Sequence, residues 1–155
     1  MAQKTAWTGS SVTESDINTY LMHEGGAWTT YVPTLSQSVT VTKTVTYASY
    51  ARASRMIIGT ARLAVTGTGT AANVVVIGLP VAAAASVSGC IGSGFITDTS
   101  AGPVIYTGTV ILNTTTTVTI VGSGGVVNSL GVTQFAAALA NTDIVSIQFC
   151  YEAAT

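Results

Sequence analysis

Charged side chains are scarce in this 155-residue sequence. Only 7% of the residues are Asp, Glu, Lys or Arg, while 48% are hydrophobic, whereas an ordinary soluble domain is about 25% charged. A small domain with so neutral a surface tends to associate. Symmetric self-assembly, in which identical neighbours cover the charge-poor faces, is therefore expected. The composition indicates a structural subunit.

Long hydrophobic runs are absent as well. The mean hydropathy of +0.55 would suit a membrane protein, but apolar runs such as 74–77 and 81–85 are only a few residues long. A membrane-spanning helix needs about 20 apolar residues, so no membrane span is predicted. The first five residues lack the apolar core of a secretory signal, so we expect synthesis and assembly in a cytoplasm.

Residues that bind nucleic acid or metals are few. The net charge is −1 and Lys and Arg form no cluster that could neutralise phosphates, so nucleic acid is not an expected partner. His23 is the only histidine, and Cys90 and Cys150 have no Cys or His at metal-ligand spacing, so no metal or cofactor is predicted. We expect both cysteines to be reduced and buried, while the sequence leaves a disulfide open.

The carboxylates show no arrangement for catalysis. Six are scattered along the chain, whereas glycoside hydrolysis needs two held roughly 5 to 10 Å apart. Asp98 and Asp143 lie among Thr, Ser and Asn, a setting that can bind Ca²⁺ but more often makes turns through side-chain-to-backbone hydrogen bonds. The glycines of segment 88–94 lack the following Lys of a phosphate loop and indicate a strand packed closely on its neighbour. We do not expect an enzyme.

Residues 1–27 are predicted to form an attachment segment, made of an extended arm and one short helix. The first eleven residues are small and polar apart from Trp7. Thr13 suits a helix cap, and a stripe of Ile17, Tyr20 and Leu21 follows at spacings of three and four before a Gly-Gly pair. A helix of about ten residues is not stable alone in water. Its stripe must therefore dock, either on its own domain or on a partner.

From residue 28 onward the pattern has period two, and residues 28–155 are predicted to form one β-sandwich domain. In segment 39–47, Val39, Val41, Val45 and Tyr47 alternate with Thr, which places them on one face of a half-buried strand. Lys43 interrupts this face and indicates a strand end or an edge. The other predicted strands are 55–65, 73–79, 87–97, 104–112, 116–121 and 143–151.

The segments between these strands are rich in Gly, Ser, Thr and Asn. Segments 66–70 and 122–125 are predicted turns whose glycines supply positive φ, and 135–140 is either a short helix or a loop. In the last strand, alternate residues from Val145 to Tyr151 occupy one face. Seven or eight short strands without intervening helices predict an all-β antiparallel sandwich, and eight would fit a jelly roll.

Aromatic residues concentrate near the start of the chain, and Trp and Tyr are frequent anchors at interfaces. Trp28 and Tyr31 could equally cap the end of their own sandwich, whereas Trp7 fits an interface better. The predicted attachment interface consists of Trp7, Ile17, Tyr20, Leu21, Trp28 and Tyr31.

Several short segments of the chain form a recognisable set. They are DINTYLM at 16–22, EGGAW at 24–28, the following Val32-Pro33, GTGTAAN at 67–73, GLP at 78–80 and the closing strand from DIVSI at 143–147. Together these segments resemble small virion proteins of tailed bacteriophages, particularly those that infect actinobacteria. The resemblance implies a jelly-roll sandwich, usually a homotrimer, displayed on the capsid or the tail through its N-terminal segment.

That group includes capsid decoration or head-fibre proteins and minor tail or receptor-binding proteins. A receptor-binding fibre usually carries a long shaft, whereas this chain is one sandwich with an arm and a helix, so the resemblance favours a decoration protein. The expected partners are two further copies and the major capsid protein, on the capsid surface of the virion. The alternative is a minor tail protein or tail-tip module that contacts tail proteins or a host surface receptor.

Overall fold

The computed structural model describes residues 27–87, 89–100, 102–122, 126–127, 133–134 and 137–155, which form strands, turns and loops. The predicted all-β antiparallel class is confirmed. The strands are β1 (Thr29–Thr30), β2 (Leu35–Gln37), β3 (Val39–Thr40), β4 (Lys43–Ala53), β5 (Met56–Val65), β6 (Val75–Gly78), β7 (Cys90–Asp98), β8 (Val104–Thr114), β9 (Thr117–Gly122), β10 (Val126–Val127), β11 (Thr133–Gln134) and β12 (Ile144–Glu152).

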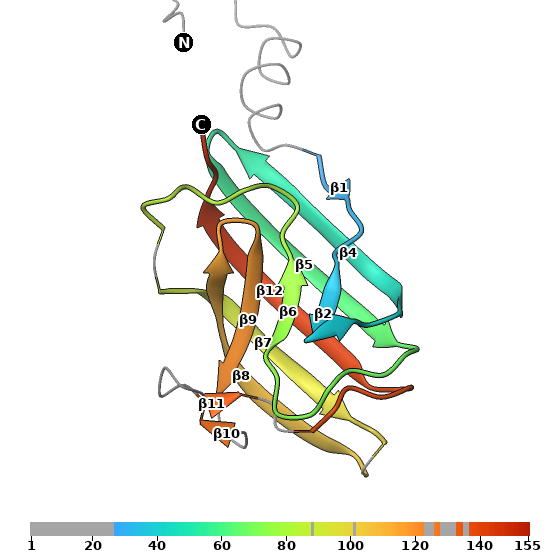
Figure 1. Cartoon of the computed structure of the whole chain (residues 1–155). Helices are drawn as coiled ribbons and strands as arrows, with labels where there is room; N and C mark the ends of the chain where they lie inside the picture. The colour runs from blue at the N-terminus through green and yellow to red at the C-terminus, as the bar shows by residue number, and fades with distance from the viewer. Residues whose placement is uncertain (1–26, 88, 101, 123–125, 128–132, 135–136) are drawn as a thin grey trace, which may run out of the picture.

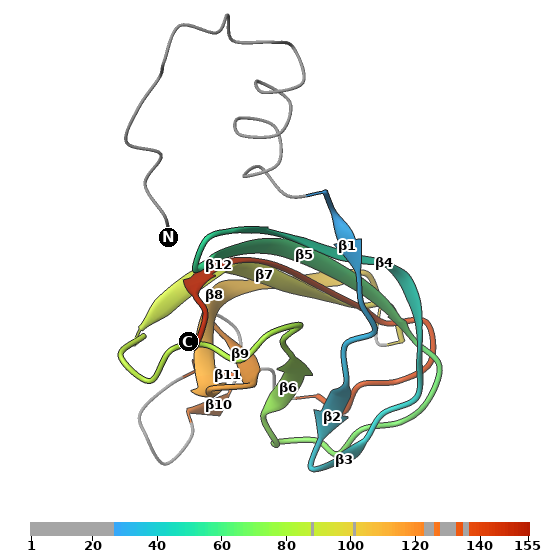
Figure 2. The same ribbon diagram turned by 90° about the horizontal axis from the view of Figure 1, so that it is seen from above.

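Ten of these strands form one antiparallel sheet in the order β1-β4-β5-β12-β7-β8-β9-β6-β2-β3, and β10 pairs with β11 in a second, two-stranded sheet. The large sheet curls over, so that β6, β2 and β3 lie beneath the layer of β4, β5, β12 and β7 (Figure 1 and Figure 2). We call the side of that layer that faces β6 and β2 the inner face, and the opposite side the outer face.

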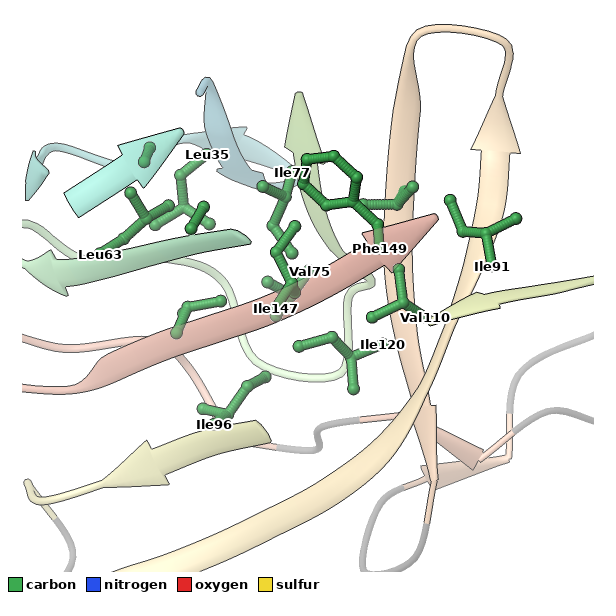
Figure 3. Packing of buried hydrophobic residues seen from close by; sticks show 14 of the residues in the cluster. Leu35, Leu63, Val75, Ile77, Ile91, Ile96, Val110, Ile120, Ile147 and Phe149 are labelled. Atoms are coloured by element: carbon green, nitrogen blue, oxygen red, sulfur yellow. The ribbon is translucent and has the colours of Figure 1, made fainter. Parts of the chain in front are cut away.

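The hydrophobic core fills the space inside the curl. Leu35 and Ile77 from β2 and β6 meet Leu63, Ile147 and Phe149 from β5 and β12 (Figure 3). All five are nearly inaccessible to solvent, and full burial of one such side chain stabilises the fold by about 1.5–3 kcal/mol. The core therefore joins the two ends of the sheet, which are not neighbours in the strand order.

Strand β12 lies at the centre of the upper layer, between β5 and β7. Val145, Ile147, Phe149 and Tyr151 are buried, whereas Gln148 and Cys150 are exposed. The predicted alternation of this strand is therefore confirmed. Residues of β5 and β7 that pair with Gln148 and Cys150 therefore also point to the outer face.

The predicted strand 39–47 differs from the observed structure in two ways. It is divided, because β3 ends at Thr40 and β4 begins at Lys43, so Lys43 does mark a strand end. The prediction that Val45 and Tyr47 share a face is wrong. A bulge between them shifts the register against β5, and one extra residue reverses the alternation that follows. Val45 packs on the core, whereas Tyr47 is 47% exposed.

Six other predicted strands are confirmed as β5, β6, β7, β8, β9 and β12, each within three residues of its predicted bounds. The very short strands β1, β2, β10 and β11 were not expected, because two or three residues are too few to display a period. Residues 137–140 have no regular structure. The predicted arm and helix, with Trp7, Ile17, Tyr20 and Leu21, lie outside the described residues, and the jelly-roll arrangement stays a prediction.

The glycines of segment 66–70 have a role that differs from the predicted one. Gly67 and Gly69 do not have positive φ. A Cβ on Gly67 would collide with the side chain of Thr42, and a Cβ on Gly69 would collide with that of Gln37. These positions therefore need glycine because the β5–β6 connection passes close to Gln37 at the end of β2 and to Thr42 between β3 and β4.

The glycines in β7 fit the predicted closely packed strand. A Cβ on Gly92 would collide with the backbone oxygen of Gln148 in β12, and a Cβ on Gly94 would lie 2.8 Å from that of Ser146. Small residues let the backbones of β7 and β12 approach here.

Candidate interaction surface

A hollow of about 570 Å³ lies on the outer face, above the junction of β4, β5, β12 and β7. Its walls are outward-pointing side chains and its floor is the backbone of these strands. The floor is backbone because the cross-strand row of Gly59, Phe149 and Gly92 faces the inner side of the sheet. The lining residues are Trp28, Tyr47, Ile58, Gly59, Thr60, Gly92, Ser93, Gln148, Phe149 and Cys150.

The walls of the hollow are largely apolar. Trp28 is 60% exposed, Tyr47 47% and Ile58 46%. Three large apolar side chains gathered at one hollow are the kind of surface that marks an interaction site. Tyr47 reaches it only because the β4 bulge turns this side chain outward.

The ring of Phe149 lies on the inner face. A Cβ on Gly59 would collide with this ring, so the absence of a side chain at Gly59 lets Phe149 lie flat against β5. Phe149 also contacts Tyr151, with ring centroids 5.7 Å apart, and Tyr31, with centroids 6.4 Å apart in an edge-to-face arrangement. The hollow therefore sits directly above an aromatic cluster of the core.

Arg62 supplies positive charge beside the hollow. It pairs across strands with Tyr47 of β4 and with Ser146 of β12, and such directly opposite residues share a face. Within the described residues, the single ion pair joins Arg55 to Glu152 at 3.0 Å. Arg62 is thus available to an acidic group that approaches the outer face.

Of the six predicted attachment residues, the structure describes two, and they lie in different environments. Trp28 is exposed at the hollow, whereas Tyr31 is half-buried and packs edge-to-face on Tyr50, with ring centroids 6.0 Å apart. The hydroxyl of Tyr31 is buried and has no hydrogen-bond partner among the described residues. Burial, together with the nearby Tyr151, raises the pKa of Tyr31 well above its usual value. Tyr31 therefore serves the core, while Trp28 remains open to a partner.

The expectation of buried cysteines is wrong. Cys90 and Cys150 are free thiols, and both are exposed. Cys150 points outward because it follows the inward Phe149 in β12, and it lines the hollow. Period two in the last strand already places Cys150 opposite the apolar residues, which was the signal in the sequence for its exposure.

Asp98 and Asp143 are buried carboxylates at one end of the sheet. The Oδ1 atom of Asp143 accepts hydrogen bonds from the backbone N–H groups of Thr99 (2.9 Å) and Ser100 (3.2 Å), and its Oδ2 atom accepts one from Ala140 (2.8 Å). The predicted turn role of Asp143 is confirmed and extends to a second loop. Among the described residues, no group of three or more His, Cys, Asp or Glu side chains could hold a metal ion.

The burial of these two carboxylates leaves a large surface without charge. They are the only charged residues between Arg62 and Glu152 in the sequence, so the exposed parts of β6, β7, β8 and β9 carry none. Ile105 in β8 is 62% exposed on this surface. We call the outer face of β7 and β8 the neutral face.

Comparisons with known proteins add no assignment. No protein-family model matches the chain, and neither the curated proteins nor the solved structures contain a significant match to it. Within the described residues, no helix is long and apolar enough to cross a membrane.

Proposed function

We propose that this chain is a structural protein of a tailed-phage virion, a capsid decoration protein that binds the assembled shell as a homotrimer. The observation that carries the proposal is the neutral face. A surface with hydroxyl and aliphatic side chains but no charge presents no like-charge repulsion to a second copy. The sequence resemblance supplies the class of particle, and the proposal retains its jelly-roll sandwich.

In this proposal the neutral faces of three subunits pack around a threefold axis. Residues 1–27 attach the trimer to the major capsid protein, and the proposal assigns no catalytic step to the chain. Binding to the assembled shell, and not to its separate subunits, would stabilise the particle by mass action.

The trimer is tested by sedimentation at micromolar concentration, with an expected mass about three times the 15.7 kDa of one chain. Ile105→Lys places a charge on the neutral face and should yield monomers, because a buried unpaired charge costs several kcal/mol. Met56→Lys is the matched control: Met56 is 50% exposed, and it follows Arg55 at the charged end of β5. A stable wild-type monomer, or equal effects of the two variants, would contradict this use of the neutral face.

The location is tested by labelling intact particles with an antibody to the chain. Label over the head supports decoration of the capsid. Label at the tail end supports the second candidate, a minor tail protein or a tail-tip module that binds a host receptor. Trp28 and Tyr47, exposed at the hollow, are the observation behind this candidate, because exposed aromatic side chains are frequent contacts in recognition surfaces. A receptor in the hollow and the occupant proposed in the next subsection exclude one another.

A further inference from the structure

We propose that the hollow on the outer face is the docking site of residues 13–24 of the same chain, with Ile17, Tyr20 and Leu21 seated in it. These three residues form the apolar stripe that the sequence predicts for this segment. The inference goes beyond the proposed function and narrows the attachment segment proposed there, since it seats Ile17, Tyr20 and Leu21 on their own domain. It leaves residues 1–12, with Trp7, as the part of the attachment segment that is open to a partner.

The position at which the described chain begins supports this occupant. Trp28 lines the hollow, and β1 enters the fold from the outer-face side of the sheet (Figure 2). Only residues 25–27 separate the stripe segment from Trp28, and Gly25 and Gly26 permit a sharp reversal. Four residues reach at most about 14 Å, so the end of the segment cannot lie far from the hollow.

The volume and character of the hollow fit the stripe. Its 570 Å³ is in the range of about 300–1,000 Å³ typical of sites that enclose a small ligand, which is room for a Tyr and a Leu side chain. Trp28, Tyr47 and Ile58 would be covered together with the stripe. Each fully buried aliphatic side chain contributes about 1.5–3 kcal/mol to stability. A short helix is not stable alone in water, so it depends on such burial to form.

Charge complementarity gives the same assignment. Residues 1–26 contain one cation, Lys4, against three acids, Glu14, Asp16 and Glu24, whereas residues 27–155 contain four cations and three acids. Two of those three acids are buried and the third is paired with Arg55. Arg62 stands beside the hollow and would face the acidic segment. An attached segment also has an effective concentration in the millimolar range, which favours it over the same segment of a second copy.

The test uses the two exposed thiols, because Cys150 lines the hollow and Cys90 does not. The reduced full-length protein is treated with N-ethylmaleimide, and the two modification rates are followed by peptide mass spectrometry. Docking should slow Cys150 relative to Cys90 by about tenfold or more, since a covered group reacts only when the cover opens.

Leu21→Asp removes an apolar side chain from the stripe and should raise the Cys150/Cys90 rate ratio by about tenfold, to the value of the uncovered surface. Thr19→Asp is the matched control, because at 100° per residue it lies on the opposite side of the helix from the stripe, and it should leave the ratio unchanged. Ile58→Ser alters the hollow itself without adding a charge opposite Cys150, and it should reproduce the effect of Leu21→Asp. Circular dichroism checks that the sheet is intact in each variant.

Three outcomes would overturn the proposal. The first is an equal response of the ratio to Leu21→Asp and Thr19→Asp. The second is a wild-type ratio that Leu21→Asp does not change. The third is protection of Cys150 that disappears on dilution to nanomolar concentration, which would assign the hollow to a second copy. Protection that is independent of concentration supports docking within one chain.

Discussion

Replacing Gln37 with Glu should make the stability of this protein strongly dependent on pH. Gln37 is completely buried at the end of β2. Its Nε2 group donates hydrogen bonds to the carbonyl oxygens of Ala137 (2.8 Å) and Asn73 (3.2 Å), and its Oε1 atom accepts one from the N–H of Leu139 (2.8 Å). The amide thus holds two long loops on the end of the sheet.

Gln37→Glu keeps the shape of the side chain and changes only its hydrogen-bonding groups. At pH 7 the carboxylate would keep the bond from Leu139 but would face the two carbonyl oxygens of Asn73 and Ala137 with no proton to donate. A buried charge left without its partner costs about 3–5 kcal/mol. When the carboxyl group is protonated it can donate to one carbonyl again, and the remaining cost is one lost hydrogen bond, about 1 kcal/mol.

The sign of the pH dependence follows from where the proton is bound. In the folded Gln37→Glu variant, burial and the two carbonyl oxygens raise the pKa of the introduced carboxyl group above its unfolded value of about 4.3. Below that value the variant should have nearly wild-type stability. As pH rises, the unfolded chain loses its proton first, so the free energy of unfolding falls by about 1.4 kcal/mol per pH unit until the folded pKa is reached.

The assay is urea denaturation of wild type and variant at several pH values between about 4 and 7.5, which span the expected titration. Asn113→Asp is the matched control, because Asn113 is exposed in β8, and its effect should remain within about 0.5 kcal/mol of zero throughout. Equal losses in the two variants at pH 7 would refute the reasoning. So would a loss in Gln37→Glu that does not shrink toward pH 4.

Three further changes test other buried polar groups and one turn. Asp143→Asn puts an NH₂ group against a backbone donor, so it should lower the unfolding free energy by about 2–3 kcal/mol. The control, Glu152→Gln, changes an exposed side chain and should cost less than about 1 kcal/mol. Equal losses of the two variants in urea denaturation would contradict this. Tyr31→Phe removes a buried hydroxyl that has no hydrogen-bond partner in the described part of the chain, and it should raise stability by about 1 kcal/mol. Tyr151→Phe loses a 2.6 Å bond to a backbone carbonyl and should lower stability by about 1 kcal/mol or more; the same sign for both would refute the assignment. Because burial raises the pKa of Tyr151 to about 12, its contribution is complete below pH 10 and should decline as pH rises from 10 to 12, which thermal melts of wild type and Tyr151→Phe can measure. Ser54→Gly, at a residue with φ of 55° in the β4–β5 turn, should raise the melting temperature through about 0.5 kcal/mol of relieved backbone strain, and a lower melting temperature would contradict this.

The outer face shows how far sequence patterns extend. The alternation of β12 predicts that Gln148 and Cys150 point away from the apolar residues, and the structure agrees. The same rule fails in β4, because the bulge before Tyr47 adds one residue to the strand. A bulge depends on how β4 pairs with β5, so the period within β4 alone cannot reveal it.

The hollow illustrates the same limit. The sequence predicts Trp28 as a candidate interface residue because Trp and Tyr are frequent anchors at interfaces. The sequence does not predict Tyr47, Ile58 and Cys150 as a group, because the bulge in β4 turns Tyr47 outward and Cys150 meets Ile58 only through the distant pairing of β12 with β5.

The sequence by itself determined the local and compositional properties of this protein: its β-strands, its closely packed glycines in β7 and its scarcity of charge. These follow from the period of side chains along a strand and from counting residues. Only the tertiary structure decided that the two late carboxylates are buried, which makes the neutral face free of charge, and that Gln37 binds groups 36 to 102 residues away. Such contacts depend on strand order and register, which arise from the packing of the whole chain and leave no periodic trace along it.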